Sequence, residues 1–250
     1  MPRPHVVYEA IRQEGEIELA RPTAALAWSD LAAGLSMGFS MVAQGTLIAM
    51  LPPAPWRPLV SSLGYSVGFV IVILGRQQLF TENTITPILP LLLNKTRERL
   101  FNVGRLWAVV LTSNILGTLL FALLASSRGI FAANVQAAFV SLGTQAAAPD
   151  FATLLVRGVF AGWLIALLVW LLPNAQQART LVIFLITYVV GVCGLSHVIA
   201  GSLEVLAAVF AGAVTWQHYL AGFLLPVLLG NVVGGVALVA GLNHAQVVPD

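Results

Sequence analysis

The sequence predicts an all-α membrane protein with six transmembrane helices, of which the second and fifth are broken in mid-span. Of its 250 residues, 58% are hydrophobic and 9% are charged, and the mean hydropathy is +0.90. Soluble domains carry about 25% charged residues, so these few charges would not cover the surface of a soluble fold. We therefore expect the bilayer to be the solvent, which calls for spans of about 20 mostly apolar residues.

The first 24 residues lie outside the expected spans. They contain three arginines and four glutamates, without the apolar core or small-residue cleavage site of a signal peptide. Val7 and Ile11 fall on one helical face and Glu9 and Arg12 on the other. Residues 1–24 are predicted to form a cytoplasmic amphipathic segment.

Apolar regions follow along the rest of the chain. They cover residues 25–51, 59–93, 103–125, 154–172, 180–210 and 219–242. The second and fifth regions exceed one span but cannot hold two with a loop between them, so each is expected to be one span made of two pieces. Irregular backbone is tolerated in a bilayer only where it is buried in protein or lines a cavity.

Basic residues in the connections predict the orientation. Four of them lie between Lys95 and Arg105, after the second region, and Arg179 follows the fourth. The alternate connections carry fewer, so the positive-inside rule places both termini, including a tail over residues 243–250, in the cytoplasm.

Paired small and polar residues suggest an internal repeat of two three-span halves, about 25–125 and 154–242, within a pore domain over residues 25–242. The matched pairs are Gly34/Gly38 with Gly158/Gly162, Gly75/Leu79 with Gly191/Leu195, and Asn114/Gly117 with Asn231/Gly234. Halves of three spans insert with opposite orientation, an arrangement found in transporters. The small pairs are expected to serve close helix packing, and the alignment makes Thr81 and His197 equivalent.

Charged and polar residues mark the first interruption. Arg76, Glu82 and Asn83 lie within it, and Glu204 lies beyond the second. A charge at a helix centre costs about 2.5–3.5 kcal/mol. We therefore expect Arg76 to form a structural ion pair with Glu82 or Glu204 rather than to contact substrate.

The second interruption holds Ser196 and His197, the only histidine inside a predicted span. A neutral imidazole could simply satisfy backbone groups freed by the break, but ionisable residues within the membrane usually mark transport sites. The surrounding sequence lacks metal-ligand spacing, a phosphate loop and paired carboxylates, so we expect no metal, cofactor or enzyme activity. A net charge of +2 gives no indication of a nucleic-acid partner.

Two motifs resemble those of the formate–nitrite transporter family. Leu79-Phe80-Thr81-x-Asn83 is similar to the family's first break, and Gly194-x2-His197-x2-Ala200 is similar to its second. Ser113-Asn114-x2-Gly117, Arg157-Gly158 and Trp163-x3-Leu167 also fall where the family would have them, so the resemblance runs from about Trp28 to Leu242. It implies a homopentamer of aquaporin-like protomers, each with its own pore, among the lipids of a bacterial inner (plasma) membrane.

The resemblance also implies the residues of the pore. Thr81 would face His197, and hydrophobic constrictions would include Leu79 and Phe80, with Phe69, Ile165 and Val190 added by spacing. The substrates would be small monovalent anions of weak acids, such as formate or nitrite. A narrow apolar constriction excludes an anion, so His197 is expected to protonate it to the neutral acid and recover the proton later.

Several positions depart from the family pattern. Ser196 stands where the family has an acidic residue, and Gly201 and Gly162 stand where it has asparagines. The lysine of one family vestibule falls near Ala146. These differences indicate a divergent branch.

Two other functions stay open: a channel for small neutral solutes with a structural histidine, and a non-transporting membrane scaffold that acts through its N-terminal helix.

Overall fold

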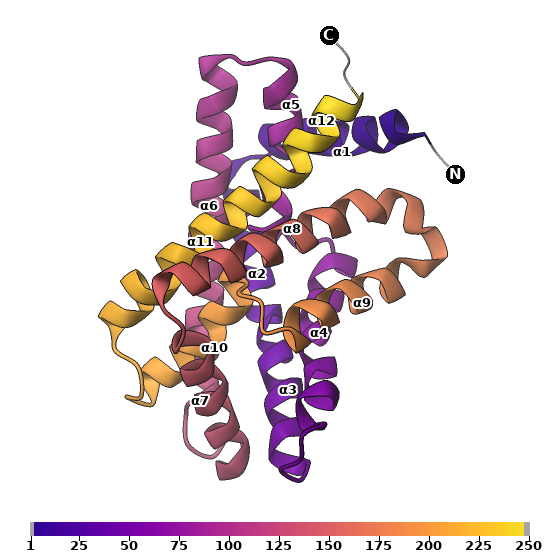
Figure 1. Cartoon of the computed structure of the whole chain (residues 1–250). Helices are drawn as coiled ribbons and strands as arrows, with labels where there is room; N and C mark the ends of the chain where they lie inside the picture. The colour runs from indigo at the N-terminus through magenta and orange to yellow at the C-terminus, as the bar shows by residue number, and fades with distance from the viewer. Residues whose placement is uncertain (1–2, 248–250) are drawn as a thin grey trace.

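The computed structural model describes residues 3–247, and all regular structure in that range is helical (Figure 1). Residues 1–2 of the predicted N-terminal segment and 248–250 of the predicted tail lie outside it. In chain order the elements are α1 (Pro4–Ala20), α2 (Thr23–Ser36), α3 (Gly38–Met50), α4 (Arg57–Leu74), η1 (Glu82–Thr84), α5 (Ile88–Leu93), α6 (Arg97–Ala125), α7 (Ala133–Ala147), α8 (Phe151–Ala175), η2 (Gln176–Ala178), α9 (Arg179–Val192), α10 (Val198–Phe210), η3 (His218–Leu224), α11 (Leu225–Val233), η4 (Gly234–Gly241) and α12 (Leu242–Val247).

Five helical stretches of the described chain are long and apolar enough to cross a membrane. They are Thr23–Met50, Arg57–Leu74, Arg97–Ala125, Phe151–Val192 and His218–Val247. The fourth contains α8 and α9, which turn back on each other at η2 and pack together (Figure 1). Val198–Phe210 is a shorter apolar helix. The helical membrane fold is confirmed, and the count of six spans stays a prediction.

The two predicted interruptions are present as non-helical backbone. After α4, the chain runs without helix from Gly75 to Thr81 before η1 and α5 begin. After α9 ends at Val192, α10 begins at Val198. The helices around them pack in pairs: α2 against α6, α4 against α9, and α8 against α11 and η4.

Glycines allow two of these helix pairs to approach closely. A Cβ atom on Gly34 of α2 would lie 2.9 Å from Cα of Gly117 on α6. A Cβ atom on Gly162 of α8 would lie 2.6 Å from Cα of Asn231 on α11. Real Cβ atoms do not approach so closely, which confirms that these small residues serve helix packing.

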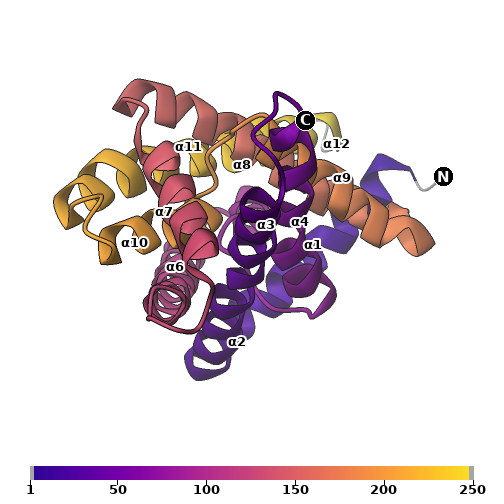
Figure 2. The ribbon, with the colours of Figure 1, turned by 90° about the horizontal axis from the view of Figure 1, so that it is seen from below.

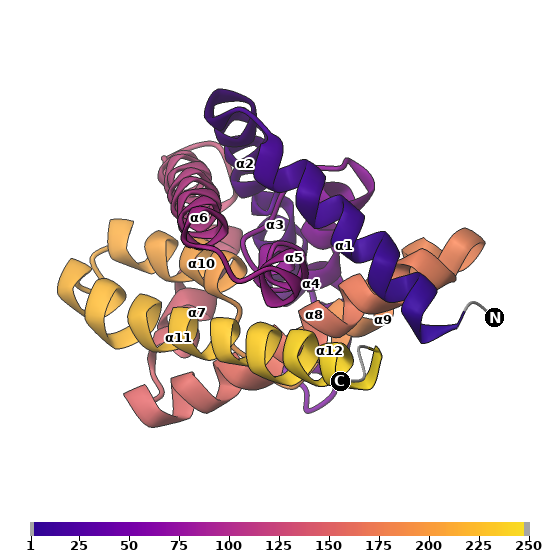
Figure 3. The same ribbon diagram turned by 90° about the horizontal axis from the view of Figure 1, so that it is seen from above.

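The predicted amphipathic N-terminal helix is α1, which lies across α5 and α8 (Figure 3). Its apolar face is buried: Val7 is 3% exposed and Ile11 is 1% exposed. The Tyr8 hydroxyl is 2.8 Å from Nδ1 of His244 on α12. Both described ends of the chain therefore meet on one side of the molecule, which we call the α1 side (Figure 1).

Helix α7 was not predicted from the sequence. It packs against α3 and α10, and the ends of α3 and α7 point away from α1 (Figures 1 and 2). Its 15 residues are too few to span a bilayer and carry no charge, which is why they resembled a connection. The side that holds α7 is called the α7 side.

Candidate functional site

Thr81 and His197 meet at the centre of the fold. Oγ1 of Thr81 lies 2.7 Å from Nε2 of His197, and both residues are fully buried. Thr81 comes from the first break, and His197 is the N-cap residue of α10 after the second. The structure thus brings together the two residues expected to face each other.

The hydrogen bonds of His197 assign its ring proton. Nδ1 accepts the backbone N–H groups of Ile199 at 3.3 Å and Ala200 at 3.2 Å. An atom that accepts two N–H groups carries no hydrogen, so the proton of the neutral imidazole is on Nε2. Nε2–H therefore donates to the Thr81 hydroxyl oxygen. One ring nitrogen caps a helix and the other orients Thr81.

An asparagine holds the first break together. Oδ1 of Asn114, on α6, accepts the backbone N–H of Phe80 at 2.9 Å. Its Nδ2 donates to the carbonyl oxygens of Gln78 at 3.0 Å and Asp30 at 2.8 Å. The bonds to Phe80 and Gln78 satisfy backbone groups of the break that no helix satisfies, as buried backbone requires, and the bond to Asp30 ties the break to α2.

A second asparagine does the same for the second break. Oδ1 of Asn231, on α11, accepts the backbone N–H of Val198 at 2.9 Å. Its Nδ2 donates to the carbonyl oxygens of Ser196 and Gly158, both at 2.9 Å. In each break, one amide side chain bonds to the residues on either side of a central position.

That central position is Leu79 in the first break and His197 in the second. The predicted equivalence of Thr81 and His197 is therefore wrong by two residues. The backbone conformation agrees with a register that pairs Leu79 with His197. The same register pairs Arg76 with Gly194, and both have positive φ angles, +55° and +60°. The sequence alignment paired Gly75 with Gly191, but Gly75 has an ordinary φ of −74° that does not require glycine.

The five residues expected to form apolar constrictions are all fully buried. The Phe69 ring packs edge-on against the His197 ring with centroids 5.0 Å apart. The Phe80 ring lies 5.9 Å from that of Trp107, whose indole N–H donates to the Asn83 carbonyl at 2.8 Å. The set is Phe69, Leu79, Phe80, Ile165 and Val190. Their action as constrictions stays a prediction.

A cavity of about 360 Å³ leads from the α7 side to His197. Its walls come from α3, α4, α7, α8, α9, α10, η3 and the second break, and include Ser196 and Glu204. Two arginines, Arg57 and Arg157, also line it. The lining includes none of the five constriction residues, so the open space ends at the histidine.

Sequence reasoning missed several residues of this cavity. Gln44 of α3, Tyr65 of α4 and Gln145 of α7 line it. Uncharged polar residues scattered over three helices give no local signal in a sequence. Among residues 3–247, no group of three or more His, Cys, Asp or Glu residues is arranged to hold a metal ion.

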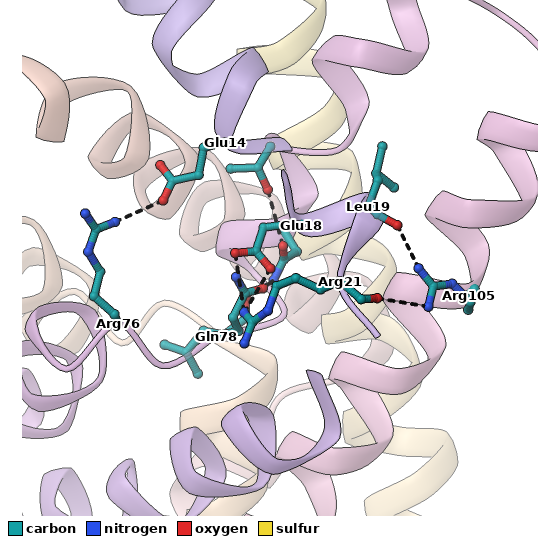
Figure 4. Close-up of polar contacts among 10 residues, drawn as sticks. Glu14, Glu18, Leu19, Arg21, Arg76, Gln78 and Arg105 are labelled. Atoms are coloured by element: carbon teal, nitrogen blue, oxygen red, sulfur yellow. Dashed lines mark hydrogen bonds and ion pairs between the residues drawn. The ribbon is translucent and has the colours of Figure 1, made fainter. Parts of the chain in front are cut away.

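The partner of Arg76 differs from the expectation. Its guanidinium is 3.1 Å from the carboxylate of Glu14 on α1, and not paired with Glu82 or Glu204 (Figure 4). The side chains of Arg76 and Glu14 are 72% and 51% exposed. The prediction was wrong because α1 folds over the first break, where its carboxylate reaches a residue assumed to lie deep in the membrane.

Further polar contacts tie α1 to the first break and to α6. Glu18 pairs with Arg21 at 3.0 Å, and the Gln78 side chain lies beside the Glu18 carboxylate (Figure 4). Arg105 of α6 donates to the Leu19 carbonyl at 2.8 Å. Burial raises the pKa of Glu18, and Arg21 opposes that rise. Helix α1 is therefore fixed over the first break by polar contacts as well as by its buried apolar face.

The side chains of the first break also bond to one another. Asn83 donates from Nδ2 to the Gln78 amide oxygen at 2.9 Å, and accepts from the Thr86 hydroxyl at 3.2 Å. Through these two bonds Asn83 is a structural part of the break. Its neighbour Glu82 has one carboxylate oxygen buried without a hydrogen-bond partner among the described residues.

Comparison with known proteins agrees with this arrangement. A model of the family described as formate/nitrite transporter matches residues 5–245. The inner membrane protein YfdC of Escherichia coli strain K12 is 41% identical over 248 residues, which cover 99% of this chain and 80% of that protein.

Two solved structures share the fold. One, described as an FNT family ion channel, superposes with a TM-score of 0.83 at 22% identity, over 98% of this chain and all of that one (100%). The other, a pentameric formate channel with formate bound, gives a TM-score of 0.72 at 18% identity, over 88% and 95% of the two chains. The family model over residues 5–245 and the 41% identity with YfdC show that this chain belongs to the formate/nitrite transporter family, whose members are membrane channels and transporters and not enzymes.

Proposed function

We propose that the protein conducts small monovalent weak-acid anions, of the formate and nitrite type, along a path through the cavity and past His197 and Thr81. The observation that carries this proposal is the Thr81–His197 hydrogen bond of 2.7 Å at the inner end of the cavity. Because the Thr81 hydroxyl oxygen accepts a hydrogen bond from Nε2–H of His197, its own hydroxyl hydrogen is free to donate to a substrate oxygen. Membership of the family and the likeness to a formate channel support the substrate class.

The apolar residues next to this pair suggest the form in which a substrate passes. An anion that enters narrow apolar surroundings loses hydration that nothing replaces, whereas its neutral acid loses far less. The fully buried Phe69, Leu79 and Phe80 would supply such surroundings. In this proposal the anion is protonated before it crosses them and releases the proton on the other side.

The likeness to a pentameric formate channel also supports a homopentamer in which each protomer contains its own path. We place the α1 side in the cytoplasm. Four of the basic residues lie on the connection to α6 and its first turns, next to α1, as the positive-inside rule requires of a cytoplasmic face. The cavity then opens to the outside of an inner membrane. Lipid would cover the remaining apolar surface.

Uptake of radiolabelled formate and nitrite into liposomes that contain the full-length protein tests the proposal. We expect uptake above that of empty liposomes, and a loss of about tenfold in Thr81→Val, which removes one hydrogen bond to the substrate. Thr118→Val is the matched control, because Thr118 is equally buried and its hydroxyl bonds only within α6, to the carbonyl of Ile115.

Three outcomes would overturn the proposal. Equal uptake in Thr81→Val and the wild type would remove Thr81 from the path. Flux of a neutral solute that is independent of pH, without flux of either anion, would favour the neutral-solute channel. Absent flux for a broad panel of solutes would favour the non-transporting scaffold.

A further inference from the structure

We propose that Glu204 is the acid that protonates the substrate in the cavity, before the substrate reaches Thr81 and His197. This inference rests on the proposed function, because it names the proton donor for that same path. From the sequence alone, Glu204 is expected only as an ion-pair partner of Arg76.

The position of Glu204 connects it to the centre of the path. His197, Gly201 and Glu204 are four and then three residues apart on and just before α10, so they share one face of that helix. All three line the cavity. Gly201 lies between them on this face, and the Phe223 ring fills the place where a side chain at Gly201 would stand, so no polar side chain of α10 separates the carboxyl group from the histidine.

A residue with a side chain would not readily fit at position 201. A Cβ atom at this position would lie 2.5 Å from Cζ of the Phe223 ring. The Phe223 ring packs there instead, so the stretch of wall between Glu204 and His197 is apolar. A substrate bound there could reach both side chains in turn.

Glu204 is the only carboxylate among the lining residues, and none of the ion pairs of residues 3–247 involves it. Its residue is only 9% exposed. An ionised carboxylate without a partner is costly in such an enclosed place. A carboxylic acid that gives up its proton there and soon regains one avoids a lasting charge.

Few titratable side chains lie near Glu204. Helices α3, α7 and α11, which pack on α10, carry no titratable side chain, and the charged residues of α6 lie in its first turns, beside α1. From η3 come Tyr219, which is buried, and His218, whose Nε2 is 2.8 Å from the carbonyl oxygen of Ala147. Arg57, Tyr65, Arg157 and His197 line the same cavity.

His197 is poorly arranged to supply the proton itself. Its single ring proton is on Nε2, and giving it up would leave an imidazolate anion. A second proton on Nδ1 would break the bonds from the amides of Ile199 and Ala200. It would also place a cation at the positive end of the α10 dipole. A separate acid is therefore needed, and Glu204 is the carboxyl group within the cavity.

The proposed step conserves atoms and charge. The O–H bond of the Glu204 carboxylic acid breaks and an O–H bond forms on the anion, which leaves a Glu204 carboxylate and the neutral acid. Hydronium from the cavity water then restores the proton to Glu204. The cationic side chains of Arg57 and Arg157 attract the anion to the cavity, and the neutral acid moves on to Thr81. Outward movement reverses the sequence.

The test compares Glu204→Gln with Glu204→Asp in liposomes that contain a pH-sensitive dye, with formate uptake and proton movement recorded together. Glutamine keeps the shape but cannot act as an acid, so formate uptake near neutral pH should fall about tenfold or more. It should recover towards the wild-type rate in acid, where bulk water supplies formic acid. Aspartate should keep most of the uptake. Ser202→Ala, a fully buried neighbour on α10, is the control and should behave as wild type.

The outcomes separate this inference from the proposed function. Wild-type liposomes without formate uptake would overturn the proposed function itself. Wild-type uptake that is unchanged or increased by Glu204→Gln would overturn only the role of Glu204, and an increase would identify its charge as a barrier to anions. If the glutamine variant does not assemble, the aspartate variant decides: a folded Glu204→Asp protein without pH-dependent formate uptake contradicts the proposal.

Discussion

Arg76 and Gly194 have the same left-handed backbone conformation at matching positions of the two helix breaks, with φ angles of +55° and +60°. Glycine adopts this conformation freely, whereas a residue with a Cβ atom pays about 1 kcal/mol for it. Arg76 gains an ion pair with Glu14 at 3.1 Å, but exposed pairs stabilise by only about 0–1 kcal/mol. The ion pair therefore offsets at most the cost of the left-handed backbone at Arg76.

Two replacements of Arg76 distinguish the effect of its backbone strain on stability from the effect of its ion pair. Both Arg76→Gly and Arg76→Ala lose the contact with Glu14, but only glycine relieves the backbone. We expect the glycine variant to be more stable than the alanine variant by about 1 kcal/mol in thermal unfolding in detergent. An alanine variant that equals or exceeds the glycine variant in stability would contradict the assignment of strain to this position.

Removing the amide of Asn114 should destabilise the first break. Asn114→Ala leaves the N–H of Phe80 and the carbonyl of Gln78 without their partner, at a cost of about 1–3 kcal/mol for each buried group. Hydrogen–deuterium exchange across residues 75–84 should rise sharply. The control is Thr118→Ala, one helical turn further along α6, which removes a single bond within the helix. Equal exchange in the two variants would contradict the role of Asn114.

Adding one methyl group should change the stability of the fold in opposite directions at two glycines. Gly34→Ala would push a Cβ atom against the backbone of α6, so we expect a loss of about 1–3 kcal/mol from overpacking. Gly104→Ala meets nothing within 4 Å and should instead stabilise α6 by up to about 1 kcal/mol. Melting temperatures of the purified variants check both signs. A neutral Gly34→Ala would show that α2 and α6 can separate at no cost.

The helix-capping role of His197 can be measured apart from transport. His197→Asn supplies another side-chain acceptor for the first amides of α10, whereas His197→Leu supplies none. The leucine variant should be less stable by about 1 kcal/mol, the usual value of an N-cap. Both variants should lose the contact with Thr81 and conduct formate poorly. Wild-type formate uptake in the asparagine variant would show that the imidazole serves only the backbone.

Docking of α1 should depend on pH through Glu18. Burial raises the pKa of this carboxyl group, so it binds a proton more readily when α1 is docked. Docking is then strongest at low pH, and weakens as the pH rises from the ordinary glutamate value through the raised one. A fluorophore on Gln13→Cys, in a Cys193→Ser background because Cys193 is exposed, reports docking between about pH 4 and pH 7.

Glu18→Gln should remove this pH dependence. Glu9 cannot replace Glu18 as its source, because the bond from Arg12 lowers the pKa of Glu9 to about 2, below the range tested. A Glu18→Gln protein with the same pH profile as the wild type would assign the effect to another group.

Much of the fold follows from local properties of the sequence. Long apolar runs predicted the membrane-spanning helices, and runs too long for one helix predicted the breaks at Thr81 and His197. Because each break is flanked by apolar helix, its irregular backbone was expected to be buried in protein, and Thr81 and His197 are indeed buried. The meeting of Thr81 and His197 was predicted by the family resemblance and not by spacing.

What the sequence did not predict depends on contacts between distant segments. The pairing of Arg76 with Glu14 requires α1 to fold across the first break, and nothing near either residue indicates that. The asparagines Asn114 and Asn231 were recognised as repeat markers, but their bonds depend on backbone shape. The register error arose for the same reason, since the left-handed position is occupied by arginine in one break and by glycine in the other.

The two asparagine bridges also bear on how the chain is made. Each amide belongs to a helix synthesised after the break that it holds: α6 follows the first break, and α11 follows the second. Until that later helix emerges from the ribosome, the open carbonyl and N–H groups of the break have no partner that lipid can provide. The broken segment and the helix behind it should therefore leave the insertion machinery together. A stalled nascent chain that ends before Asn114 should still hold its first break in an aqueous or protein-lined environment.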